Sequence, residues 1–317
     1  MNYLITGGTG FIGSYLTKQL LADGANTVVC FDYAPNPEVI QQKVSQAQMN
    51  QVKIVKGDTS DDNKALIRIC EENEIEKIIH LAGLLAAESE LNPFMATKIN
   101  CIGTLNVFET ARILSLKKVV WASSISVYGT PAQYDDEFLP NDAPHLPSTI
   151  YGMTKSFSEY MGRHYYNKYN LDTLGLRYST IYGVGRLRGS GVFTTELIEK
   201  PALGREARVP HGDDAINWLY IEDAARATIL AAESLPTKSR ALVIGGDWRP
   251  IAEVREYVMK LLPDSRIELL PGHYDLASKY DLSAAEKEIQ YKPQWSMERG
   301  VKENINQIRK ANGLPIV

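Results

Sequence analysis

The chain has 317 residues, of which 44% are hydrophobic and 23% are charged, and its formal net charge at pH 7 is -4. This composition predicts a substantial buried core, and the charge gives no electrostatic reason to expect nucleic acid or an anionic membrane as a partner. The three cysteines lie far apart without a paired spacing, which argues against a disulfide framework, and the histidines lack the spacing of metal ligands. No apolar run is long enough to span a membrane. We therefore expect a cytoplasmic protein.

The first half of the chain alternates short apolar runs with longer periodic ones. Strands are predicted at residues 2–6, 27–31, 52–56, 77–83 and 117–124. Helical patterns begin near Ile12, Asp62, Pro93 and Tyr151. The strands are apolar throughout rather than alternating, which is typical of a parallel sheet whose two faces are both covered by helices. The sequence therefore predicts an α/β fold with a Rossmann-type, doubly wound parallel sheet.

The second half predicts two further strands, at residues 173–178 and 241–246. Stretches punctuated by Gly and Pro at 182–214 and 263–273 favour a smaller C-terminal lobe built around the sheet. No linker or repeat separates the two parts, so we expect them to fold together. The predicted sheet domain comprises residues 1–178 with 215–248, and the predicted lobe comprises 179–214 with 249–317.

A glycine-rich turn, "LITGGTGFIG", joins the first strand to the first helix. Gly7 permits the tight turn, Gly10 lets backbone amides approach a pyrophosphate, and Gly13 lets the helix pack against the strand. Asp32 ends the next strand, where a carboxylate accepts both ribose hydroxyls of an adenosine. No arginine or lysine follows until Lys43, so the sequence favours NAD over NADP.

A tyrosine and a lysine lie four positions apart in "STIYGMTKSFSEY". Helical spacing places Tyr151 and Lys155 on the same face. Using Tyr151 as a base at neutral pH requires its pKa to fall by roughly three units from a reference near 10, which we expect from the Lys155 ammonium and a cationic nicotinamide. Ser124 ends the strand "VVWASS" and is placed to bond a substrate oxygen, because carboxyl ends of parallel strands face the ligand crevice.

These motifs, in this order and spacing, resemble the extended short-chain dehydrogenase/reductases, also called the NAD-dependent epimerase/dehydratase family. The resemblance includes "KGDTSD", "HLAG", "SSISVYG", "YGMTK", "LRYSTIYG", "YIEDAARA" and "YDLSAA" and runs from residue 2 to about residue 300. It implies that the sheet domain binds NAD, which carries the hydride, and that the lobe binds the substrate.

The resemblance also implies roles for individual residues. Tyr151 exchanges a proton with the substrate, and Ser124 assists by a hydrogen bond to the substrate oxygen. Lys155 also bonds the nicotinamide ribose, and Asn100 lies behind the site near a proton path. Asp58 and Thr59 meet the adenine, and the "LAG" segment runs along the pyrophosphate and ribose. The further cofactor-binding residues implied are Phe11, Ile12, Leu81, Ala82, Gly83 and Tyr178.

Three departures weaken the assignment to epimerases of UDP-sugars. Thr180 stands where those enzymes usually carry asparagine, Ile216 and Asn217 stand where they carry arginine and aspartate, and Gly272 replaces another arginine. Losing two arginines removes charge-assisted bonds to a diphosphate. Arg186, Arg188 and Arg205 remain as candidates for an anion site, so a nucleotide-sugar 4-epimerase with tightly bound NAD is the alternative.

Sugar-nucleotide dehydratases carry an acid pair directly after the catalytic hydroxyl, whereas this chain has Ile125 and Ser126, which disfavours dehydration. The run "HLAGLLAAESELNP" is similar to short-chain-type L-threonine dehydrogenases and related sugar or hydroxy-acid dehydrogenases, although "LRYSTIYG" departs from the threonine enzymes. We therefore predict an NAD-dependent oxidoreductase acting on a secondary alcohol or ketone of a small polar substrate. The candidate substrate-binding residues are Ala86, Ser124, Ser126, Thr180 and Arg188.

Two further hypotheses concern regulation and assembly. A regulator that senses NAD without catalysis is the second alternative, and it is disfavoured because such proteins tend to lose the tyrosine or the lysine. The helix after Tyr151 carries a second apolar face with Phe157, Tyr160 and Met161. In the family that the chain resembles, this helix and the one over residues 93–115 commonly pair with their symmetry mates, so we expect a homodimer.

Overall fold

The computed structural model describes residues 1–135, 137–276 and 278–317. Seven parallel strands form the central sheet in the order β10-β6-β5-β4-β1-β2-β3. Their bounds are β1 Asn2–Thr6, β2 Thr27–Asp32, β3 Val52–Lys56, β4 Lys77–His80, β5 Lys118–Ser124, β6 Thr173–Tyr178 and β10 Ala241–Ile244. All seven coincide with predicted strands, and the predicted Rossmann-type α/β fold is confirmed.

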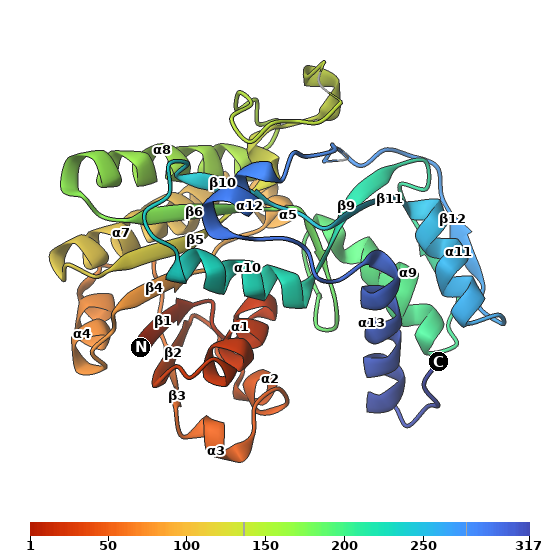
Figure 1. The fold of residues 1–317 in the computed structure, drawn as a ribbon, viewed down its shortest axis with the longest axis horizontal. Coiled ribbons are helices and arrows are strands. Elements are labelled where there is room, and N and C mark those ends of the chain that lie inside the picture. The colour runs from red at the N-terminus through yellow and green to blue at the C-terminus, as the bar shows by residue number, and fades with distance from the viewer. Residues whose placement is uncertain (136, 277) are drawn as a thin grey trace.

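Helices cover both faces of this sheet, as Figure 1 shows. They are α1 Phe11–Ala22 and α10 Ile221–Glu233 on one face, and α4 Lys64–Glu72, α7 Gly103–Ile113 and α8 Ile150–Tyr169 on the other. Strand side chains alternate between the two layers: Tyr3 and Ile5 pack in the cluster that contains α1 and α10, while Leu4 packs in the cluster that contains α4 and α7. Burial on both sides explains why the strands are apolar throughout.

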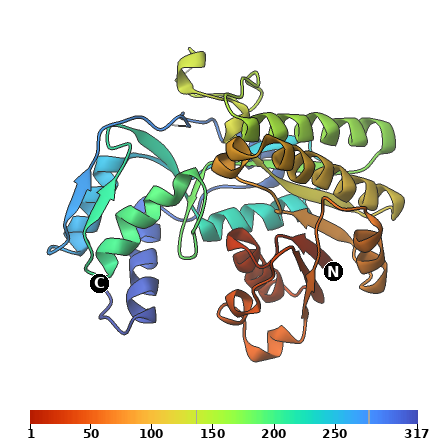
Figure 2. The ribbon, with the colours of Figure 1, turned by 180° about the vertical axis from the view of Figure 1, so that it is seen from behind.

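The second part of the chain adds a three-stranded sheet, in the order β11-β9-β7, and a parallel pair, β12-β8. These strands are β7 Thr180–Tyr182, β8 Ala207–Val209, β9 Ala215–Tyr220, β11 Asp247–Pro250 and β12 Ile267–Leu269. The accompanying helices are α9 Phe193–Ala202, α11 Ile251–Leu261, α12 Ser283–Ile289 and α13 Met297–Ala311. Seen from behind in Figure 2, the two small sheets with α9, α11 and α13 lie to one side of the central sheet.

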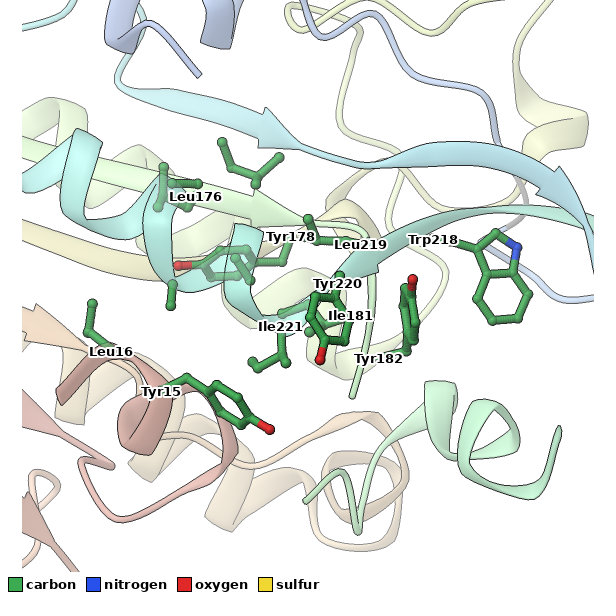
Figure 3. Packing of buried hydrophobic residues seen from close by; sticks show 14 of the residues in the cluster. Tyr15, Leu16, Leu176, Tyr178, Ile181, Tyr182, Trp218, Leu219, Tyr220 and Ile221 are labelled. Atoms are coloured by element: carbon green, nitrogen blue, oxygen red, sulfur yellow. The ribbon is translucent and has the colours of Figure 1, made fainter. Parts of the chain in front are cut away.

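Residues 215–248 contribute to both parts. β9 pairs with β7 and β11, whereas α10 packs on the central sheet and β10 is its edge strand. One hydrophobic cluster joins the parts, since Leu16 and Leu176 belong to the same cluster as Tyr182, Trp218 and Tyr220 (Figure 3). The division into a cofactor domain and a substrate lobe stays a prediction.

Short helical segments lie between the larger elements. They are α2 Pro37–Gln41, α3 Gln46–Met49, α5 Ala86–Leu91, α6 Pro93–Ala96, the π-helical turn η1 Thr97–Ile102, and the single turns η2 Ile125–Val127, η3 Pro131–Gln133 and η4 Ser190–Val192. Among the residues that the structure describes, no helix combines the length and the apolar character needed to cross a membrane.

Candidate functional site

A cavity of about 150 Å³ lies at the carboxyl ends of β4, β5 and β6, the edge at which open α/β sheets bind ligands. Ten of the residues predicted from the sequence line it: Ile12, Leu81, Gly83, Ala86, Ser124, Ser126, Tyr151, Lys155, Tyr178 and Thr180. The fold therefore brings all three candidate catalytic residues to one place. Their roles stay predictions.

Helix α8 presents its first two turns to this cavity. Thr149 caps the helix, its hydroxyl accepting from the Gly152 amide at 3.0 Å. Tyr151 and Lys155 follow one turn apart, with the Lys155 ammonium 5.4 Å from the centre of the Tyr151 ring. The ammonium donates to the Ala122 carbonyl of β5 at 2.6 Å, which fixes its position at the end of that strand.

Burial governs the ionisation of both groups. It raises the pKa of the Tyr151 hydroxyl to about 12, although a hydrogen bond with Ser124 and the charge of Arg186 act to lower it. Burial also lowers the pKa of the Lys155 ammonium to about 8. Lys155 is not among the groups that shift the pKa of Tyr151 in the chain without NAD, and its ammonium is directed at the Ala122 carbonyl. The expected acidification by Lys155 together with a cationic nicotinamide stays a prediction. A further positive charge is needed before Tyr151 ionises near neutral pH.

The loop after β7 brings a guanidinium to the cavity. Arg186 lines it and donates to the Ile181 carbonyl at 2.6 Å. Its Nε is buried and has no hydrogen-bond partner among the described residues. Gly191 makes this position possible, because a Cβ there would lie 2.9 Å from the guanidinium carbon. Of the three arginines named from the sequence as candidates for an anion site, Arg186 alone lines the cavity, whereas Arg205 and Arg188, the latter also named as substrate-binding, are exposed and do not line it.

A hydrogen-bonded network supports the end of β5 behind the cavity. The Ser124 hydroxyl accepts from the Ser126 amide at 3.1 Å and lies 3.0 Å from the Ser126 hydroxyl. The Ser123 hydroxyl donates to Glu159 at 2.6 Å, and Arg177 forms a bidentate pair with the same carboxylate at 2.6 and 2.8 Å. This buried pair ties α8 to β5 and β6, so the helix that carries Tyr151 has a fixed position on the sheet.

The remaining predicted cofactor residues do not line the cavity. Most of them follow β1, β2, β3 and β4 along the same edge of the sheet, and Asn100 lies in η1. They are Gly7, Gly10, Phe11, Gly13, Asp32, Asp58, Thr59, Ala82 and Asn100. The Asn100 amide bonds both backbone groups of Leu84, accepting at 2.8 Å and donating at 3.1 Å, and it donates to the Thr154 hydroxyl at 3.2 Å. Asn100 thereby joins the segment after β4 to α8.

The glycine turn fits a dinucleotide. Gly7 has a φ of 69°, which favours glycine, and a Cβ on Gly13 would lie 2.6 Å from the Gly7 carbonyl oxygen. The chain thus turns tightly and α1 begins close to the turn. The Asp32 carboxylate lies beside it, accepting from the Thr9 hydroxyl at 2.8 Å and from the Ala34 amide at 3.2 Å. These residues would hold the pyrophosphate and adenosine ribose of NAD.

Several residues that line the cavity were not found from the sequence. Leu84, Leu85, Ser190, Tyr274 and Leu276 contribute to its wall. Ser190 and Tyr274 are 84 residues apart in the sequence, and neither lies in a recognisable motif. For Leu84 and Leu85, the available signal was their place directly after "HLAG".

Replacing Lys155 tests the burial of its ammonium through stability. In the folded chain the pKa of Lys155 falls from 10.5 to about 8. Below pH 8 both folded and unfolded chains carry the proton, so the penalty of burial is fully present. Between pH 8 and 10.5 only the unfolded chain keeps it, so the contribution of this lysine to stability improves as pH rises.

We therefore expect the difference in unfolding free energy between Lys155→Met and the wild type to change in favour of the wild type by roughly 3 kcal/mol across that window. Denaturant unfolding of nucleotide-free protein at several pH values measures it. Lys168→Met, at an exposed position on the same helix, is the control. A difference independent of pH would contradict the burial of the ammonium.

Comparisons with known proteins identify the family. Residues 3–245 match the NAD dependent epimerase/dehydratase family. A UDP-glucuronate 4-epimerase of Thermodesulfobacterium geofontis is 29% identical over 96% of this chain and 95% of its own length. An uncharacterised protein of Methanocaldococcus jannaschii is 30% identical, with the same coverage of 96% and 95%.

Solved structures share the fold. A UDP-glucose 4-epimerase of Thermotoga maritima has a TM-score of 0.86 at 24% identity, covering 98% of this chain and 100% of its own. An L-threonine dehydrogenase of Cupriavidus necator has a TM-score of 0.86 at 24% identity, covering 97% and 100%. The family match extends over most of the chain and includes the glycine turn and the tyrosine–lysine pair. This chain is therefore an NAD-dependent enzyme that belongs to the NAD dependent epimerase/dehydratase family, the extended short-chain dehydrogenase/reductases.

Proposed function

We propose that this enzyme is a 4-epimerase of nucleotide sugars whose sugar carries an anionic group. The half-buried guanidinium of Arg186, whose buried Nε has no partner among the described residues and which shares the cavity with Tyr151, carries the proposal. Arginine binds carboxylates through charge-assisted bonds, and such bonds matter most where water is excluded. Relatives named UDP-glucuronate 4-epimerases act, by their names, on a sugar with a carboxylate. They favour the epimerase alternative over the dehydrogenase that we predicted from the sequence.

The residues of the cavity suit reversible oxidation at a carbon that bears a hydroxyl. NAD, when bound, accepts a hydride from that carbon and returns it. Tyr151 takes the hydroxyl proton and gives it back, and the Ser124 hydroxyl holds the substrate oxygen. The positive charge of Arg186 lowers the pKa of Tyr151, so the group that binds an anionic substrate also helps the phenol to ionise.

A small-molecule dehydrogenase is the second candidate, and the size of the cavity favours it. About 150 Å³ is less than the 300 to 1,000 Å³ that is typical of drug-sized ligand sites. Ile216 and Asn217 are also buried and provide no cation for a diphosphate. A free hydroxy acid fits such a cavity, and its oxidation would leave NAD reduced.

Tyr151→Phe removes only the oxygen that exchanges the proton. We expect turnover to fall by at least about 100-fold, because no other hydroxyl replaces the base, while NAD affinity stays within about twofold. Steady-state rates and NAD titration by calorimetry measure the two effects. Turnover at the wild-type rate would rule out Tyr151 as the base.

A substrate panel separates the two candidates. We expect UDP-glucuronate to be interconverted with its 4-epimer without net reduction of NAD, and Arg186→Met to raise KM for it at least about tenfold through loss of a charge-assisted bond. UDP-glucose should be affected less. Product chromatography and absorbance of the reduced nicotinamide are the measurements.

Arg188→Met is the matched control, since Arg188 is exposed in the same loop, and it should leave KM unchanged. Stoichiometric NAD reduction by a free hydroxy acid, with no conversion of UDP-sugars, would instead establish the dehydrogenase. Equal KM values for UDP-glucuronate in the wild type and Arg186→Met would remove Arg186 from the site.

The proposed assembly is a homodimer formed through α8 and its neighbours. Large apolar side chains are exposed on α8 and on the adjoining α5 and α6. Leu91 is 85% exposed, Phe94 77% and Tyr160 66%. A second copy that covers these side chains would bury surface that is costly to leave in water.

Introducing charge on this surface tests the assembly. The double variant Phe94→Glu with Tyr160→Glu should give a monomer mass by light scattering at micromolar concentration, where the wild type gives a dimer mass. Leu235→Glu, at a site that is equally exposed but lies between α10 and β10, should leave the dimer intact. A wild-type monomer would contradict the proposal.

A further inference from the structure

A tyrosine from the C-terminal part of the chain forms part of the wall of the candidate catalytic cavity. Tyr274 and Ser190 both line the cavity, and their hydroxyls lie 3.0 Å apart. The Tyr274 ring also packs edge-on against Phe193, with ring centres 5.5 Å apart, and against His211 at 5.3 Å. Phe193 is buried in the main core, so the Tyr274 ring is held between the core and the cavity.

The segment that carries this tyrosine is fixed from outside. We call residues 271–276 the strap, and Asp213 with Asp214 the latch. Asp214 accepts from the Tyr274 amide and lies 3.0 Å from Nδ1 of His273. Asp213 accepts from the Gly272 amide at 3.0 Å. The latch holds the backbone of the strap, so it does not depend on the Tyr274 side chain.

Residues on both sides of the strap restrict its position. Before it, the Leu270 amide donates to the Val209 carbonyl at 2.8 Å, which continues the β12-β8 pair. The turn that leads to the latch begins at His211, whose φ of 64° is unusual for a residue other than glycine. Such a conformation persists only where the surrounding contacts determine it, and here the His211 ring packs on Phe193 and Tyr274.

We infer that Tyr274 is a specificity-determining residue, whose ring, held by the strap and by Ser190, limits the size of the group that a substrate can carry beyond the reacting carbon. The inference rests on the proposed function in one respect, that this cavity is the catalytic one. With the strap in place the cavity measures about 150 Å³, which is small for a drug-sized ligand. We therefore expect the Tyr274 ring to restrict a nucleotide sugar more than a small hydroxy acid.

Tyr274 shares the cavity lining with Tyr151 and Arg186. Its presence contributes to raising the pKa of Tyr151 and of Arg186. Burial remains the first cause in both cases, raising the pKa of Tyr151 and lowering that of Arg186. Because all three side chains line the same cavity, a substrate bound there meets the Tyr274 ring as well as Tyr151 and Arg186.

Quenching of bound NADH fluorescence by acrylamide tests the inference without any substrate. We expect Tyr274→Ala to increase the quenching constant at least about threefold, because removal of the ring opens the cavity to the neutral quencher. Tyr274→Phe keeps the ring and should match the wild type. Equal constants for the alanine variant and the wild type would overturn the inference.

Asp214→Asn provides a second variant that leaves the ring in place. It weakens the latch and should also raise the quenching constant, so the test survives if Tyr274→Ala fails to fold. NADH affinity and the melting temperature, measured for each variant, show whether the cofactor still binds to a folded protein. An unchanged quenching constant in a folded Asp214→Asn protein would contradict the role of the latch.

The preference for short over long substrates is a second, kinetic test of the role of Tyr274. In Tyr274→Ala the ratio of kcat/KM for a long substrate to that for a short one should rise at least about tenfold, mainly through KM of the long substrate. UDP-glucuronate and free glucuronate form one such pair, and hydroxy acids of increasing length form a second series. An unchanged ratio would overturn the inference. If the wild type converts no UDP-sugar, the proposed epimerase fails, while the quenching result still decides the role of Tyr274.

Discussion

The candidate catalytic centre depends on the removal from water of two ionisable side chains at the end of β5. Lys155 is buried with its ammonium bonded to the Ala122 carbonyl, and half-buried Tyr151 lies one helical turn before it. Removal from water disfavours the charged form of each group. The positive charge of Arg186 offsets this effect only in part at Tyr151, so proton transfer by the phenol requires a further charge, which oxidised NAD would supply when bound.

Arg186 shows how the two parts of the chain cooperate. Helix α8, which packs on the central sheet, supplies Tyr151 and Lys155, whereas the loop after β7 supplies the cation. Gly191 leaves room for the guanidinium plane, and the Ile181 carbonyl accepts one of its donors. The Nε of Arg186 has no partner among the described residues, and leaving a buried donor without a hydrogen bond lowers the free energy of unfolding when no ligand is bound. Such a cost is expected where a site is prepared for an anion.

The sequence was sufficient for the central sheet, because its signals are local, and it indicated three candidate catalytic residues that the fold brings to one cavity, although their roles stay predictions. Apolar runs mark the seven strands, and a spacing of four residues places Tyr151 and Lys155 on one helical face. The family and its NAD cofactor were also predicted, from motifs whose order along the chain is specific. The pKa of Tyr151 could not be predicted, since it depends on how completely the surrounding elements exclude water.

Contacts between segments that are distant in the sequence could not be predicted from local patterns. Three arginines of the C-terminal half looked equivalent in the sequence, and only the course of the loop distinguishes Arg186, which faces the cavity, from exposed Arg188. Tyr274 meets Ser190 across 84 positions of chain, and neither has a motif around it. The substrate preference was accordingly the weakest part of the prediction, and the relatives shift it from dehydrogenase toward epimerase.

The uninterrupted hydrophobic cluster shown in Figure 3 has a mechanical consequence. Proteins that engulf a ligand by rotating two lobes need a poorly packed seam between them, about which a hinge can bend. Here one buried cluster extends from Leu16 and Leu176 of the central layers to Tyr182 and Trp218 of the second part, so the described residues leave no poorly packed seam between the two. Entry and exit of ligands must therefore rely on rearrangement of peripheral segments, while the body of the enzyme stays rigid.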